Sequence, residues 1–104
     1  MIFLKIDIAN NIKTVELLKV ELMQKLTDFC GDIAAEPDCE TLTNLTCDAA
    51  GIINIAYVTA MRLGIEIEDI NEMMIKQLDA EIKNNHLIEK RYGDLSRLRE
   101  AISD

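Results

Sequence analysis

The sequence predicts an all-α protein: a helical bundle of three main helices and a short C-terminal helix, preceded by an extended N-terminal arm. Apolar residues recur at spacings of three and four along most of the chain, as they do on one face of a helix. Pro37, Gly64 and Gly93 stand where that periodicity breaks, so they mark helix ends. A length of 104 residues, with 49% hydrophobic and 29% charged residues, is typical of a single folded domain, here residues 1–104.

Residues 1–10 are expected to form the arm or a short strand. Leu4, Ile6 and Ile8 alternate with charged residues, which is the two-residue period of a strand. One strand makes no sheet by itself, so we expect this segment to pair with a second copy or to lie on the helices.

Two long helices are predicted next, over residues 14–34 and 39–63. Residues 36–38 should connect them, because a proline disfavours helix at the residue before it. The second helix should end at Gly64, which suits a left-handed C-terminal cap. The apolar face of the first helix is expected to consist of Leu18, Leu22, Leu26, Phe29 and Ile33.

A third helix is predicted over residues 66–85, with an acidic first turn at the positive end of the helix dipole. Asp94 is a candidate N-cap for the closing helix at residues 95–102. His86 lies between the two helices beside two asparagines, and we expect a surface or capping role for it.

The composition excludes several kinds of partner. A net charge of −8 argues against binding nucleic acid or an anionic membrane through a basic face. The three cysteines have no CxxC spacing and His86 is the single histidine, so a zinc site is not expected. We find no apolar segment with the length of a targeting signal or a membrane span. These features predict a cytoplasmic protein.

A line of polar residues interrupts the otherwise apolar second helix. At about 100° per residue, one side of this helix carries Thr41, Asn44, Asp48, Ile55, Thr59 and Arg62. A helix that is apolar around most of its circumference is buried in its own core or in a partner, and a chain this short has few helices to cover it. We therefore expect a homo-oligomer, most simply a dimer, in which Asp48 is paired or neutralised.

Acidic residues also line one side of the first helix. Glu21, Lys25, Asp28 and Asp32 fall within about 60° of each other around the helix axis. The carboxylates of Asp28 and Asp32 on this helix, joined by that of Asp48 on the second helix, would offer the oxygen ligands that Mg²⁺ prefers. Two other interpretations stay open. The acids on the first helix can be solvated flank residues with Lys25 paired to its neighbours, and a buried Asp48 can be satisfied by hydroxyl, amide or arginine groups.

The stretch Asp48–Asp69 has an aspartate near the start of an apolar helix, which ends in Leu-Gly-Ile before an acidic helix start. This pattern resembles the MazG-like all-α nucleotide pyrophosphohydrolases, and the resemblance extends over about residues 14–92. That family pairs Glu-x-x-Glu on one helix with Glu-x-x-Asp on the next. Here the second pair reads Leu45-Thr-Cys-Asp48, and Asp28-Phe-Cys-Gly-Asp32 is the nearest substitute for the first.

The resemblance implies a Mg²⁺- or Mn²⁺-dependent hydrolase that cuts a nucleoside triphosphate between its α and β phosphates. The metal ligands that it implies are Asp28, Asp32 and Asp48. The residues that would support these ligands or contact the substrate are Glu21, Asn44, Lys83 and Asn84. The missing glutamates favour a second hypothesis, a non-catalytic helical homodimer that binds a protein or a nucleotide. A third, a purely structural or regulatory helical partner of another protein, predicts no metal dependence.

Overall fold

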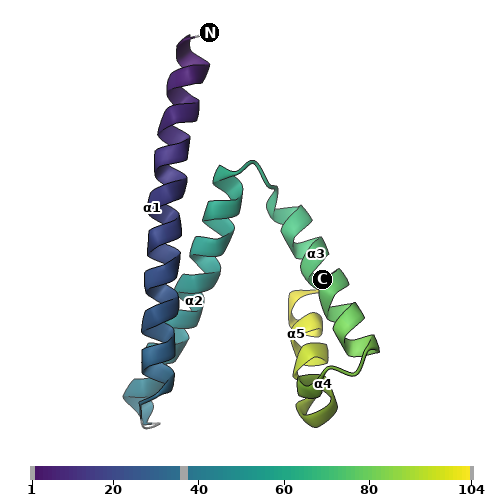
Figure 1. Ribbon diagram of the computed structural model, residues 1–104. Helices are drawn as coiled ribbons and strands as arrows, with labels where there is room; N and C mark the ends of the chain where they lie inside the picture. The colour runs from purple at the N-terminus through teal and green to yellow at the C-terminus, as the bar shows by residue number, and fades with distance from the viewer. Residues whose placement is uncertain (1, 36–37, 104) are drawn as a thin grey trace. The chain divides into compact units, whose positions relative to one another are not determined.

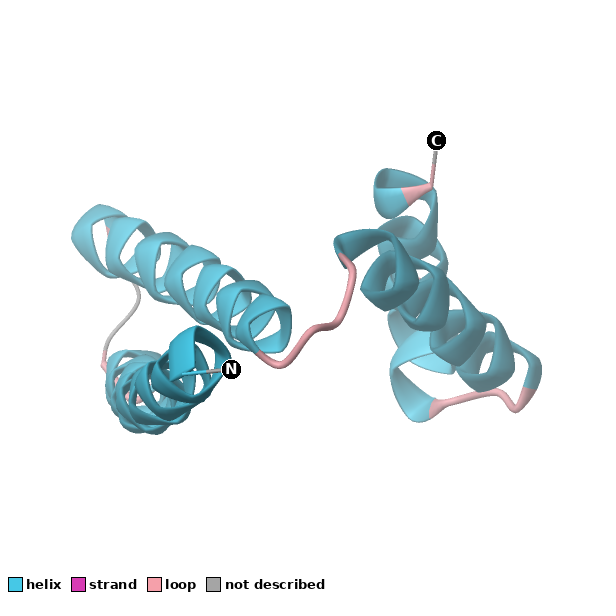
Figure 2. Ribbon diagram, turned by 90° about the horizontal axis from the view of Figure 1, so that it is seen from above, coloured by secondary structure: helices cyan, strands magenta, loops and turns pink. Residues whose placement is uncertain are grey.

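The computed structural model describes the backbone of residues 2–35 and 38–103, and the side chains from residue 8 onward within these ranges. Every regular element in the described ranges is a helix (Figures 1 and 2), which confirms the predicted all-α class. The chain divides into two compact units, Met1–Ile65 and Glu66–Asp104. The helices are α1 (Ile2–Ile33), α2 (Cys39–Arg62), α3 (Ile67–Lys83), α4 (Leu87–Tyr92) and α5 (Asp94–Ile102).

The first unit is a hairpin of α1 and α2, which lie side by side in both views (Figures 1 and 2). Asn11 Nδ2 donates a hydrogen bond of 2.6 Å to the carbonyl of Arg62, which ties α1 to the C-terminal end of α2. The half-buried residues of α1 alternate spacings of three and four, the pattern of a seam between two helices. They are Asn11, Val15, Leu18, Leu22, Lys25, Phe29 and Asp32.

The expected N-terminal arm or strand is wrong, because residues 2–10 form the first part of α1 (Figure 1). The helix continues through Asn10, whose carbonyl accepts a hydrogen bond of 2.9 Å from Thr14 Oγ1. A lone strand leaves its backbone groups without partners, whereas each residue added to an existing helix gains one hydrogen bond. The predicted start at residue 14 is therefore too late. The side chains of residues 1–7 lie outside the described residues.

Local signals set the ends of α2, and its predicted bounds are correct to within one residue. Asp38 Oδ1 accepts the backbone N–H of Thr41 at 2.7 Å and so caps the first turn. Gly64 adopts a φ of +87°, and the N–H groups of Gly64 and Ile65 donate to the carbonyls of Met61 and Ala60 at 3.0 Å. This is a Schellman ending, which glycine permits without strain. Of the predicted connection, residues 36 and 37 lie outside the described residues.

Of the two coverings expected for α2, its own core or a partner, the first is wrong, because the first unit does not bury α2 on most sides. None of its residues is buried, and Leu42 and Ile53 are 60% and 54% exposed. The polar line instead supplies the half-buried residues Thr41, Asp48 and Thr59. The reason is geometric: α1 is one helix, and one helix covers a single stripe of its neighbour.

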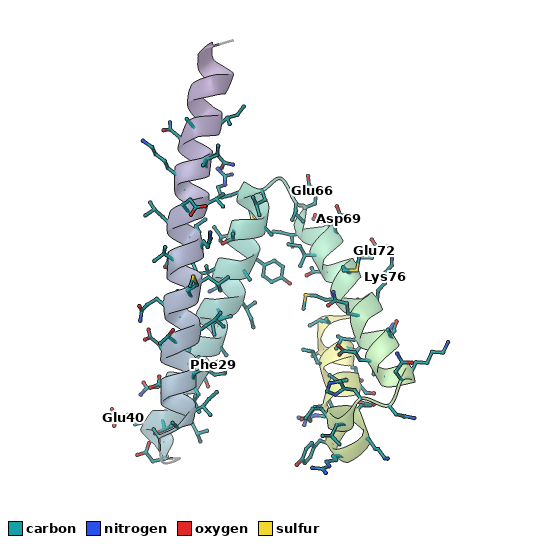
Figure 3. All side chains as sticks on the ribbon, viewed as in Figure 1. Phe29, Glu40, Glu66, Asp69, Glu72 and Lys76 are labelled. Atoms are coloured by element: carbon teal, nitrogen blue, oxygen red, sulfur yellow. The ribbon has the colours of Figure 1, made fainter. Side chains whose placement is uncertain are left out.

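The predicted apolar face of the first helix is also partly wrong. Leu26 and Ile33 are 44% and 58% exposed, although Phe29, labelled in Figure 3, is half-buried as expected. The seam with α2 is displaced around the helix and takes in Lys25 and Asp32 in their place. Charged side chains therefore come to lie between two helices.

The second unit is built by α3 packing against α5, and Leu78 of α3 is only 7% exposed. Across the same contact, Arg99 Nη2 donates to Asp79 Oδ2 at 3.3 Å, and Arg99 Nε donates to Asp79 Oδ1. On the surface of α3, Glu72 and Lys76 form an ion pair of 3.6 Å (Figure 3). Leu78 is the one buried hydrophobic residue in the part of the chain that the structure describes.

The ends of the helices that follow α2 differ from the prediction. α3 ends at Lys83, and α4 is an additional helix that begins at Leu87. His86 is its N-cap, and His86 Nδ1 accepts the N–H of Ile88 at 3.1 Å. The expected capping role of His86 is confirmed. Asp94 is wrong as an N-cap, because it is the first residue of α5. The cap comes from α4 instead, where Glu89 Oε1 accepts the N–H of Ser96 at 3.0 Å.

Within the described residues, no helix has the length and apolar character that a membrane-spanning segment requires.

Candidate functional site: a carboxyl cluster between α1 and α2

Asp48 lies in the seam between α1 and α2 and is half-buried. Its Oδ2 atom is shielded from solvent, and no hydrogen-bond donor among the described residues reaches it. Buried polar atoms normally have a hydrogen-bond partner, because water is no longer available to them. Asp48 Oδ2 is therefore the first atom of the hairpin to consider as a ligand for an ion.

The aspartates of α1 act directly on Asp48 and raise its pKa. The largest cause is the carboxyl group of Asp32, which lies within hydrogen-bonding reach, so that the protonated form of Asp48 is favoured. Partial loss of solvent and the negative charges of Asp32 and Asp28 raise the pKa further. The structure thus brings Asp28, Asp32 and Asp48 together as electrostatic neighbours.

Asp28 is at the solvent-exposed edge of the cluster. One turn earlier on α1, Gln24 Nε2 donates to Asp28 Oδ1 at 3.0 Å, which fixes one oxygen of this carboxylate. This bond leaves the second oxygen of the carboxylate to other contacts. Asp28 can therefore contribute negative charge and one oxygen from the side of α1.

Lys25 is the cation of the cluster, and its side chain crosses to α2. A Cβ atom added at Gly51 would lie 3.4 Å from Lys25 Nζ and 3.6 Å from Lys25 Cδ. The absence of a side chain at Gly51 therefore lets the lysine lie against α2. The positive charge of Lys25 lowers the pKa of Asp48, although the causes that raise it prevail. Pairing of Lys25 with acids of its own helix, one of the open interpretations, is not what the structure has: no ion pair of Lys25 within 4.0 Å occurs in the described ranges.

The donor chemistry of the cluster fits a magnesium ion that arrives with a ligand. No three His, Cys, Asp or Glu side chains in the described ranges are arranged to hold a metal ion by themselves. Magnesium, however, commonly binds one or two protein carboxylates, keeps several waters and takes its other oxygens from substrate phosphates. Asp32 and Asp48 supply such a pair, and Asp48 Oδ2 has no hydrogen-bond partner within the part of the chain that the structure describes.

The other predicted residues do not join the cluster. Glu21 and Asn44 are exposed, and within the described part of the chain neither makes a hydrogen bond or ion pair with the aspartates. Lys83 and Asn84 belong to the second unit, where Asn84 ends α3 and its N–H donates to the Ala80 carbonyl at 3.0 Å. The sequence reasoning missed Gly51. Its signal was a glycine in the middle of a helix, one turn after Asp48.

The fold and this cluster define a class of protein: an all-α chain whose first two helices form a hairpin with carboxyl groups in its seam. The model of the MazG-like family matches residues 8–95, most of the chain, so the chain belongs to the MazG-like family. Neither the search of curated proteins nor the search of solved structures finds a match.

Proposed function

We propose that this protein is a magnesium-dependent nucleotide pyrophosphohydrolase that cuts a nucleoside triphosphate between its α and β phosphates, with Mn²⁺ as a substitute for Mg²⁺. The observation that supports this proposal most is Asp48 Oδ2, a shielded carboxylate oxygen without a donor, beside the carboxyl group of Asp32. Membership of the MazG-like family supports the same reaction class. The three exposed, unpaired cysteines agree with a reducing cytoplasm as its location.

In this proposal the residues of the hairpin bind and orient, and the metal supplies the charge. Asp32 and Asp48 would hold the ion, and Asp28 would add negative charge at the open edge. When bound, the ion would screen the phosphates and lower the pKa of a coordinated water. Lys25 would balance part of the negative charge of the aspartates. Glu21, Asn44, Lys83 and Asn84 remain candidates for contacts to the nucleotide.

The experiment is a screen of nucleoside triphosphates for pyrophosphate release with Mg²⁺, with Mn²⁺ and with EDTA. Asp48→Asn should abolish release while the circular dichroism spectrum stays that of a helical protein, because the amide keeps the shape but not the charge. Asp28→Asn and Asp32→Asn should lower the rate by more than about tenfold. Cys30→Ala and His86→Ala should change the rate of pyrophosphate release little, because neither residue belongs to the carboxyl cluster. No metal-dependent release from any triphosphate would overturn the proposal.

A second candidate function is a non-catalytic homodimer that binds a protein or a nucleotide. The observation that favours it is the exposure of large apolar side chains on both helices of the hairpin, including Leu17 at 71%, Val20 at 64% and Leu42 at 60%. Apolar surface of this kind is typical of helices that meet a partner. This candidate predicts self-association without metal-dependent hydrolysis, so sedimentation velocity together with the pyrophosphate screen separates the two.

A further inference from the structure

We infer that Lys25 is an internal cation of the carboxyl cluster and that it competes with a divalent metal ion for the carboxylate of Asp48. The inference rests on the proposed function, because it concerns the same metal site, and it names the residue that sets the affinity of that site for metal.

The first argument is the position of the ammonium group. Lys25 is half-buried in the seam, and its Nζ atom would lie 3.4 Å from a Cβ at Gly51. Gly51 follows Asp48 by three residues, and residues three apart share one face of a helix. The lysine therefore lies on the same face of α2 that carries Asp48.

The second argument concerns the contacts that the carboxylate of Asp48 and the ammonium group of Lys25 make. Asp48 Oδ2 has no donor, and Lys25 has no ion pair within 4.0 Å among the described residues. The two charges nevertheless attract each other across the seam. An ammonium group is a compact charge on a flexible stem with three donors, so rotation of the Lys25 side chain can change the distance between its charge and the carboxylate of Asp48.

The consequence concerns metal binding. A divalent ion at Asp32 and Asp48 would stand beside a positive charge that already offsets part of the negative charge of the aspartates. Mutual repulsion between the two cations weakens metal binding, and the effect is larger in a partly shielded seam than in water. The natural protein should therefore bind free metal weakly, and removal of the lysine charge should strengthen binding.

The test measures the dissociation constant of Mn²⁺ by the loss of the free-ion EPR signal. Lys25→Met keeps the apolar stem against Gly51 and removes the charge, and Lys25→Gln is a second neutral variant. Lys19→Met is the matched control, because Lys19 is exposed on the same helix and pairs with Glu16 at 3.6 Å. Circular dichroism establishes that each variant is helical.

We expect Lys25→Met and Lys25→Gln to lower the dissociation constant of Mn²⁺ by about tenfold or more. Lys19→Met should leave it within about twofold, because an exposed charge away from the seam is screened. Asp48→Asn in the Lys25→Met background should remove the tight binding. Equal affinity in the natural protein and the Lys25 variants would overturn the inference and leave the metal site intact. No Mn²⁺ binding to the natural protein or to either Lys25 variant would overturn the metal site as well.

Discussion

The carboxyl group of Asp32 on α1 lies within hydrogen-bonding reach of that of Asp48 on α2. Two carboxylates that lie this close repel each other when both are ionised, and this repulsion contributes to the raised pKa of Asp48. The contact joins the two helices at low pH and opposes their packing at high pH. It also gives the hairpin a place where a bound cation would relieve repulsion.

The pH dependence of stability should show this contact. Because the pKa of Asp48 in the folded state lies above the ordinary value of 3.8, the folded state binds the proton of Asp48 more tightly than the unfolded state does. Its stabilising contribution is full below pH 3.8 and is lost as the pH rises through the raised pKa. Asp48→Asn does not titrate. The Tm of this variant relative to the natural protein should therefore rise across that window and then level off, as thermal unfolding at a series of pH values would show.

Asp38 is the matched control for this measurement, because its pKa is shifted in the opposite direction. The backbone and side chain of Thr41 donate to it and lower its pKa below 3.8. Its contribution is therefore present above pH 3.8 and lost as the pH falls through the lowered pKa. The Tm of Asp38→Asn should therefore lie below that of the natural protein above pH 3.8, and this difference should shrink as the pH falls. A Tm difference for Asp48→Asn that falls with rising pH would contradict our assignment of the Asp32–Asp48 contact.

Two glycine-to-alanine variants should change the free energy of unfolding in opposite directions, because one glycine has a positive φ and the other lies inside a helix. Gly64 has a φ of +87°, where a side chain is strained, so Gly64→Ala should lower the free energy of unfolding by about 1 kcal/mol. Gly31 is inside α1 with no atom within 4 Å of an added Cβ, so Gly31→Ala should raise it by about 0.5 kcal/mol. Urea unfolding followed by circular dichroism measures both. The same sign for the two variants would refute the cap at Gly64.

The oligomeric state should depend on the outer face of α2. Leu42 and Ile53 are 60% and 54% exposed and, at a separation of eleven residues, lie on one side of the helix. We expect the natural protein to sediment as a homo-oligomer, most simply a dimer, and Ile53→Glu to dissociate it by placing a charge in an apolar contact. The control is Asn54→Glu, an exposed neighbour about 100° away around the helix. A monomer at micromolar concentration would contradict this prediction.

The sequence by itself determined the helical class and most helix ends. Helix ends follow from local chemistry: Asp38 can cap the helix after it, and Gly64 can adopt a positive φ, whatever the rest of the chain does. The resemblance to the MazG-like family was readable in the same way, because the segment from Asp48 to Asp69 is continuous in the sequence.

The tertiary structure decided which face of each helix meets another. A helical wheel gives the angle of a side chain but not the position of its neighbour, so it did not reveal that Leu26 is exposed while Lys25 and Asp32 face α2. It also did not reveal that Gly51 leaves space for Lys25. Residues 2–10 alternate weakly as a strand would, yet they are helical because α1 offers their backbone groups hydrogen bonds that a lone strand lacks.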